Sequence, residues 1–261
     1  MTPAICSASP ATERSGPVEK SIIWRGILAG ALGGVLAFVF AKIFTEPVID
    51  RAIGFEDEMA HSHGEHEHGV ELFTRGVQGN IGMGFGVFAF AVAMGALLAV
   101  VFAVVYGRVG ETAPRQLAMR VAGSMLLCLY VVPALKYPPN PPAASLEETI
   151  RQRTLLYVLM VVLSAALFVA AVLVRRRLAQ RLDGWNATLI AAGGYVVAIA
   201  VVMVALPAID ETPEHFPADL LYEFRLYSLG TQVVMWATIG AVFAALMHRL
   251  LGSPDRETIA A

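Results

Sequence analysis

Six long apolar runs, separated by shorter polar segments, dominate the pattern of this chain. They cover residues 22–44, 81–106, 117–135, 154–174, 187–206 and 229–247. A helix needs about 20 mostly apolar residues to cross the hydrocarbon core of a bilayer. Open strands leave backbone groups without partners in lipid, so each run is expected to be helical. The pattern therefore predicts an all-α fold, a multi-pass transmembrane helix bundle with six spans.

The third run is the weakest of the six. Arg120 lies near its start and Pro133 near its end. An arginine at this position can extend its guanidinium to the headgroups, so it does not exclude a span. A bundle with five spans, without this run, stays open.

Glycines are concentrated on the first two runs. Gly26, Gly30, Gly33 and Gly34 lie in the first, and four more lie at the start of the second. Small residues spaced four apart let two membrane helices approach closely. We therefore expect close helix packing through these faces, within the chain or with a partner span.

Composition supports a membrane protein and excludes other classes. The chain has 261 residues, of which 57% are hydrophobic and 15% charged, and its mean hydropathy is +0.64. Soluble domains carry about 25% charged residues. The net charge of −2 and the absence of a basic stripe argue against nucleic-acid binding. Cys6 and Cys128 lie far apart in unlike surroundings, so a disulfide framework is not expected.

The polar segments divide the chain into tails and loops. Residues 1–20 form a polar N-terminal tail, 21–251 the transmembrane domain and 252–261 a C-terminal tail. The first run is too long for a signal-peptide core and lacks a convincing cleavage site, so we interpret it as a retained span. Loops 45–80, 136–153 and 207–228 are predicted on one side of the membrane.

Basic residues predict the orientation of the bundle. The two tails, the turns 107–120 and 175–186, and Arg25 and Arg249 near the tails carry together 12 of the 19 Lys and Arg residues but only 6 of the 21 acids. Short cytoplasmic loops are enriched in Lys and Arg, and Arg175, Arg176 and Arg177 lie in such a turn. Both termini are therefore predicted to be cytoplasmic, and the three acidic loops external.

One external segment has the composition of a metal-binding site. Residues 56–71 read EDEMAHSHGEHEHGVE and contain four of the six histidines, His61, His63, His66 and His68. Neutral imidazole is the commonest protein ligand for first-row divalent ions, and carboxylates can complete the coordination shell. The steps of 2, 3 and 2 residues do not match a helix, so the spacing favours a pliable capture site. The alternative is a solvated loop without a specific role.

Weaker candidates lie elsewhere. The third external loop combines several acids with His215, which could concentrate cations or add a ligand; the alternative is an ordinary exposed loop. Within the runs, Met83, Met125, Cys128 and Met235 could line a path for a soft ion, but packing residues are the more favoured interpretation. No acid lies in the middle of any run, which is unlike proton-coupled pumps.

Enzyme motifs are not found. The chain contains no Walker motif and no GxSxG sequence. A membrane enzyme of the histidine-box type needs several converging histidine clusters, and this chain has one cluster plus His215 and His248, the latter predicted at the opposite membrane face. We therefore expect no enzymatic activity and no cofactor other than a bound or transported divalent metal.

Four segments together resemble the CbtA-type cobalt transporter subunit family. They are WRGILAGALGGVLAF in the first run, AHSHGEHEHG, LKYPPNPPA after the third run, and FPADLLYEFRLYSLGTQ before the sixth. The resemblance covers most of the chain. It implies a multi-pass protein of the bacterial cytoplasmic (inner) membrane that takes up cobalt, with nickel as the alternative, for cobalamin biosynthesis. The family is often drawn with five spans, which would reverse one terminus.

The resemblance also implies roles for residues and partners. The four clustered histidines would capture the ion. Lys136, Tyr137 and the prolines that follow would form a stiff outer element, with a simple rigid connector as the alternative. Residues 216–225 would form a re-entrant or interfacial helix before the last span. The expected partner is a small single-span CbtB-like subunit with its own histidine-rich motif, and a homo-oligomer stays open. A non-transporting metal sensor or accessory subunit, which binds metal for a partner, is the alternative function.

Overall fold

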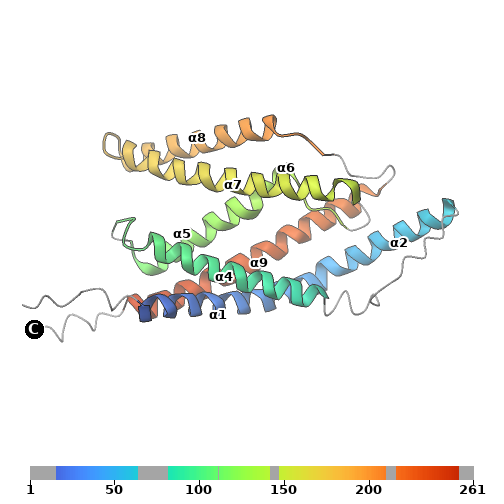
Figure 1. Cartoon of the computed structure of the whole chain (residues 1–261), viewed down its shortest axis with the longest axis horizontal. Coiled ribbons are helices and arrows are strands. Elements are labelled where there is room, and N and C mark those ends of the chain that lie inside the picture. Colours follow the sequence, from blue (N-terminus) through green and yellow to red (C-terminus); the bar gives the residue numbers. More distant parts are fainter. Residues whose placement is uncertain (1–15, 64–81, 111, 142–146, 210–215, 253–261) are drawn as a thin grey trace, which may run out of the picture.

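The computed structural model describes residues 16–63, 82–110, 112–141, 147–209 and 216–252, and every regular element in these ranges is helical (Figure 1). The helices, with η for π-helical segments, are α1 Gly16–Phe40, η1 Ala41–Thr45, α2 Glu46–His63, α4 Met83–Val105, α5 Pro114–Leu126, η3 Leu127–Val131, α6 Val132–Lys136, α7 Glu147–Leu178, α8 Gly184–Ala205 and α9 Ala218–Leu251. The predicted all-α fold is confirmed.

Among the described residues, six helical segments are long and apolar enough to cross a membrane. They are Val18–Met59, Met83–Val105, Pro114–Lys136, Thr149–Leu178, Gly184–Ala205 and Ala218–Leu251. The third, which is the weakest in the sequence, is 23 residues long because η3 and α6 continue α5 without a break. By length and composition, the structure therefore agrees with six spans.

The segment expected to be a loop from residue 45 is helical as far as His63. The first span passes through η1 directly into α2, so that residues 16–63 form one continuous helical rod. Hydropathy ends the apolar run at residue 44 because α2 is amphipathic. Its apolar residues Val48, Ala52 and Phe55 follow helical spacing and pack against α9. The rest of the histidine-rich loop, from residue 64 to 81, lies outside the described residues.

A core of four helices, α1, α4, α5 and α9, holds most of the buried apolar side chains. The approach of α1 to α4 is unusually close. A Cβ atom on Gly95 would lie 2.3 Å from the carbonyl oxygen of Gly26, and one on Gly30 would lie 2.5 Å from that of Ala91. Only glycine fits at such distances, so the close packing predicted for the glycine-rich first span is confirmed.

Helices α7 and α8 form an antiparallel hairpin beside this core (Figure 1). The hairpin packs against η3 and α6 through a smaller apolar cluster built on Val132, Tyr137, Met160 and Ile199. Much of its remaining surface is apolar and exposed, as expected for side chains that face lipid.

The connections alternate between two ends of the bundle. The start of α1, the α4–α5 turn, the α7–α8 turn and the end of α9 lie at one end, on the left of Figure 1. The end of α2 and the starts of α7 and α9 lie at the other end, on the right. The arginines of the triplet 175–177 are thus at the first end, and the helix that leads to the histidines is at the second.

Candidate functional site

Beyond the bundle, α2 and the first turns of α9 form a helical pair, which we call the stalk. Its contact surface contains the buried residues Val48, Ala52, Phe216, Leu220 and Phe224. Phe55 and Phe216 meet edge to face, with ring centroids 5.5 Å apart, a favoured geometry for aromatic pairs. The stalk is therefore held mainly by apolar contact between segments about 170 residues apart.

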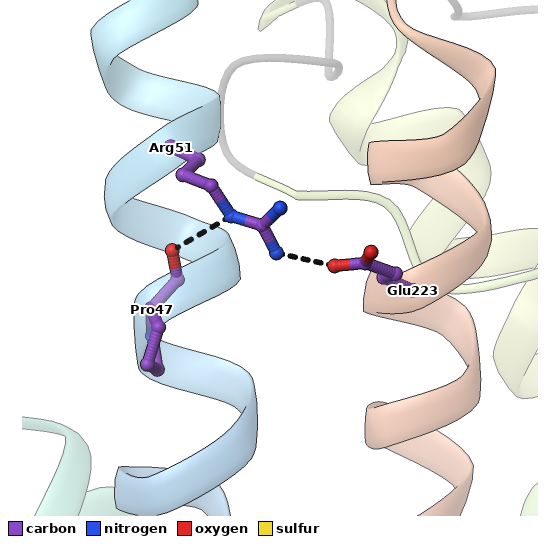
Figure 2. A network of polar contacts seen from close by, with 3 residues as sticks. All are labelled: Pro47, Arg51 and Glu223. Carbon is purple, nitrogen blue, oxygen red and sulfur yellow. Dashed lines mark hydrogen bonds and ion pairs between the residues drawn. The ribbon is translucent and has the colours of Figure 1, made fainter.

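One ion pair bridges the two helices of the stalk. The guanidinium of Arg51 on α2 contacts the carboxylate of Glu223 on α9, while its Nε donates to the Pro47 carbonyl oxygen at 3.4 Å (Figure 2). Both side chains are substantially exposed, 56% for Arg51 and 36% for Glu223. Exposed pairs contribute about 0–1 kcal/mol, so this one orients the stalk more than it stabilises it.

The stalk leads to the predicted metal ligands. His61 and His63 lie in the last turn of α2, the helical continuation of the first span. With a rise of about 1.5 Å per residue, the 18 residues of α2, Glu46–His63, extend about 27 Å along the helix axis. His66, His68 and His215 lie outside the described residues. In the described part of the chain, no three His, Cys, Asp or Glu residues gather in a way that could hold a metal ion.

Acidic residues precede the histidines on the same helix. Glu56, Asp57 and Glu58 are exposed on the last turns of α2. Exposed carboxylates raise the local concentration of cations near their surface. The end of α2 therefore has the negative potential that a cation-capture segment requires.

The described part of the predicted stiff outer element, residues 136–141 (KYPPNP), is held at the foot of the stalk by two arginines. Arg225 of α9 donates to the Asn140 Oδ1 at 2.9 Å and to the Pro139 carbonyl oxygen at 3.4 Å. Arg153 of α7 donates to the Pro138 carbonyl oxygen. These contacts join two of the segments on which the family resemblance rests, LKYPPNPPA and FPADLLYEFRLYSLGTQ.

Tyr137 anchors the same segment to the chain that follows α8. It is almost fully buried, and its hydroxyl donates to the Pro207 carbonyl oxygen at 2.9 Å, just after α8. Burial raises the pKa of this phenol, which therefore stays protonated and able to donate. The outer element thus connects α6, α7, α8 and α9. The contacts that the structure describes for it hold these helices together.

Residues 216–225 differ from the interfacial helix that the resemblance implied. They are not a separate element, because α9 runs without interruption from Ala218 to Leu251. Its 34 residues extend about 51 Å, well beyond a hydrocarbon core of about 30 Å. The first turns of α9 therefore belong to the stalk and continue directly into the last span.

Two π-helical segments interrupt the spans, and polar side chains lie at both. At η1, the hydroxyls of Thr45 and Thr231 are 3.4 Å apart, and Thr231 also donates to the Tyr227 carbonyl oxygen at 2.9 Å. Lys42 and Glu46 pair across the same segment. Single π-helical turns within α-helices often mark functional positions, so η1 is a candidate hinge between the bundle and the stalk.

At η3 a second polar cluster lies inside the bundle. Ser164 of α7 is fully buried, and its hydroxyl is 2.8 Å from that of Tyr195 on α8. Cys128 of η3 is a free, buried thiol close to both hydroxyls. Buried polar groups in a membrane are costly unless they are paired. We call Cys128, Ser164 and Tyr195 the η3 cluster.

The sulfur-containing residues that the sequence offered as a path for a soft ion do not lie together in the structure. Met125 and Met235 are buried in the apolar four-helix core, whereas Cys128 belongs to the η3 cluster next to the hairpin. The two methionines are therefore packing residues. Sequence reasoning did not select Ser164 and Tyr195. A single serine within the apolar run 154–174 was the available signal, but its partner becomes apparent only when α7 and α8 pair.

Comparison with known proteins identifies the family. A family model described as "Probable cobalt transporter subunit (CbtA)" matches residues 19–248, from the first turns of α1 to the last turn of α9. No curated protein and no solved structure matches the chain. The match includes all four segments on which the resemblance rested, and the six candidate spans agree with a membrane subunit. The chain therefore belongs to the CbtA family of cobalt transporter subunits.

Proposed function

We propose that this protein captures cobalt(II) on the external histidine segment and passes it inward through the helix bundle. The ligands are His61, His63, His66 and His68, with His215 as an additional one. The observation that carries this proposal is the continuous helix from the first span to His63, because a ligand segment attached in this way is mechanically joined to the membrane domain. Nickel(II), which imidazole also binds well, is the alternative ion.

The proposed role of His215 as an additional ligand draws support from its neighbour in the sequence, Phe216. Phe216 packs against Phe55, six residues before His61 on α2. Six residues of helix correspond to a rise of about 9 Å. Phe216, the described residue next to His215, therefore packs against α2, the helix that leads to the four histidines.

The proposed location is the bacterial cytoplasmic membrane, with both termini in the cytoplasm. Support comes from the separation of charges between the ends of the bundle. Arg108, Arg115 and the triplet 175–177 lie at the end where α1 begins and α9 ends. Short loops rich in Arg face the cytoplasm, so the stalk and the histidines face outward.

For passage through the membrane we propose the η3 cluster as one polar step. The four-helix core consists of apolar side chains, and the only side-chain donors that its described residues offer a cation are methionine thioethers such as those of Met125 and Met235. Cys128, Ser164 and Tyr195 provide sulfur and oxygen donors in the membrane-spanning part of the chain. A membrane potential of 100 mV, negative inside, favours the entry of a divalent cation by about 4.6 kcal/mol, which is enough for facilitated uptake.

The family consists of transporter subunits, which implies a partner. We propose a small single-span, CbtB-like subunit as this partner, and we assign the chain no enzymatic activity. The capture role can be tested by replacing the four clustered histidines with Ala and measuring the uptake of radioactive cobalt into cells. Uptake at low cobalt concentration should fall at least tenfold. His248→Ala, at the opposite end of the last span, is the matched control. Unchanged uptake in the fourfold variant would disprove the capture role.

The alternative is a non-transporting sensor or accessory subunit that binds metal for a partner. Reconstitution of the purified chain alone into liposomes that contain a cobalt-responsive dye separates the two functions. A transporter should give a dye response that increases with an inside-negative potential. A chain that binds cobalt at its histidines but gives no response under any potential is an accessory subunit.

A further inference from the structure

A groove of about 650 Å³ runs along the outside of the bundle, between the α7–α8 hairpin and the rod formed by α5, η3 and α6. Its walls are almost entirely apolar, with residues such as Val131, Leu135, Ala192 and Val196. The polar exceptions are Arg175 and Thr188 at one end and Tyr195 at the middle. Such a combination of a long apolar wall and a single charged end matches an amphiphile better than an ion.

The charged end of the groove is lined by Arg175, whose guanidinium has no acidic partner among the described residues. Arg175 donates from Nε to the Thr188 Oγ1 at 2.9 Å. This bond holds the Arg175 guanidinium beside Thr188, at the charged end of the groove. Arg176 follows and donates to the Arg108 carbonyl oxygen at 3.2 Å. No carboxylate of the described residues pairs with any of the three arginines 175–177. Their positive charge is therefore available to an anionic group.

The length of the groove fits a lipid chain. Its lining on α8 extends from Thr188 to Met203, and the helical rise between these two residues is about 22 Å. One leaflet of a bilayer has about 15 Å of hydrocarbon, half of the core. An acyl chain that enters beside Arg175 and crosses one leaflet can thus lie along most of the groove, past Tyr195.

The volume argues against a buried helix as the occupant. A helix with its side chains is about 10–12 Å in diameter, so 22 Å of helix occupies on the order of 1,700 Å³. That is more than twice the volume of the groove. A single-span partner could therefore rest on the rim but not fill the groove.

We propose that this groove is a binding site for an anionic phospholipid. The phosphate pairs with Arg175 and Arg176, and one acyl chain occupies the apolar wall. Basic pockets between membrane helices recognise anionic headgroups in this manner. The lipid chain also covers Tyr195, so it shields the η3 cluster from the bulk bilayer.

The test uses the purified full chain, stripped of lipid in mild detergent and titrated with phosphatidylglycerol or phosphatidylcholine of the same acyl chains. Native mass spectrometry counts the bound lipid. The unmodified chain should bind phosphatidylglycerol at least tenfold more tightly than phosphatidylcholine, because hydrogen bonds to charged groups are stronger than those between neutral groups. Arg175→Gln should abolish this preference. It leaves Thr188 bonded to the Gly184 carbonyl oxygen, so no hydroxyl is orphaned.

A second variant tests the apolar wall. Ala192 is exposed on the groove lining, so Ala192→Phe fills the groove without entering the core and should reduce the binding of both lipids. Val197→Phe, on the exposed face outside the groove, and Arg181→Gln, in the same basic turn, are the controls and should bind as the unmodified chain does. Equal binding of the two lipids by the unmodified chain, or undiminished binding by Ala192→Phe, would overturn the proposal.

Discussion

The phenol of Tyr157 on α7 donates a hydrogen bond to the Leu129 carbonyl oxygen, 3.1 Å away on η3. In an α-helix this carbonyl would accept from the backbone of residue 133, but Pro133 has no N–H group. The side chain of one span thus donates to a carbonyl of another whose α-helical backbone donor is absent, and polar backbone groups in a membrane need such partners. The same bond attaches the hairpin to the rod formed by α5, η3 and α6.

Tyr157→Phe should therefore destabilise the protein through the unpaired carbonyl. The expected cost is about 1–3 kcal/mol, the usual penalty for a buried polar group without its partner. Thermal unfolding in detergent measures it. Tyr222→Phe, which removes a hydroxyl from an exposed side chain, is the control and should change little. If both variants unfold at the same temperature as the unmodified chain, the bond between Tyr157 and Leu129 does not contribute to stability.

Pro133→Ala tests the cause of the same bond. The substitution restores the backbone donor, so the Tyr157 hydroxyl becomes less important. Tyr157→Phe should then cost clearly less in the Pro133→Ala background than alone, with a coupling of about 1 kcal/mol in the double-mutant cycle. Additive effects would show that the phenol and the proline act independently.

The contact of α1 with α4 predicts a position-specific effect of glycine replacement. Gly95→Val places a side chain against the Gly26 carbonyl oxygen and should separate the two helices, at a cost of more than 3 kcal/mol. Gly86 lies on the same helix, and a Cβ there would meet nothing within 4 Å. Gly86→Val is therefore the matched control. Expression and thermal unfolding should fall only for Gly95→Val, and equal losses would contradict the close packing.

The stalk allows apolar and ionic contributions to be compared directly. Phe216→Ala removes a buried aromatic contact and should cost about 3 kcal/mol, whereas Glu223→Gln breaks an exposed pair and should cost at most about 1 kcal/mol. Hydrogen exchange of the α2 amides measures local opening. A hundredfold acceleration is expected for the first variant and about fivefold or less for the second. The reverse order would show that the ion pair dominates.

The six spans could be predicted from the sequence because each is a run of apolar residues long enough to cross lipid. The stalk could not, because its helices are amphipathic: Val48, Ala52 and Phe55 have a recognisable function only opposite Phe216, Leu220 and Phe224, far along the chain. Ser164 and Tyr195 were missed for the same reason. His61 and His63 lie at the end of a helix that the spacing of the histidines did not suggest, and their metal binding stays a prediction.

The hydrogen bonds of Arg225 to the outer element predict an energetic coupling between Arg225 and Asn140. Arg225→Lys keeps the charge but loses the planar fork that reaches both the Asn140 side chain and the Pro139 carbonyl oxygen. We expect a coupling of about 1–2 kcal/mol between Arg225→Lys and Asn140→Ala in thermal unfolding. Arg151→Gln, on an exposed position near the start of α7, should not couple.

The η3 cluster predicts a separation of transport from stability. Cys128→Ala removes a sulfur donor but leaves the bond between Ser164 and Tyr195 in place, so the unfolding temperature should change by only a few degrees. If the cluster is a polar step for the cation, the maximal rate of cobalt uptake should fall at least fivefold, while the cobalt concentration for half-maximal uptake stays nearly constant. Met125→Leu, a conservative change in the apolar core, should leave both quantities unchanged. Normal uptake by Cys128→Ala and by Ser164→Ala would exclude the η3 cluster from the path and assign it to packing of the hairpin alone.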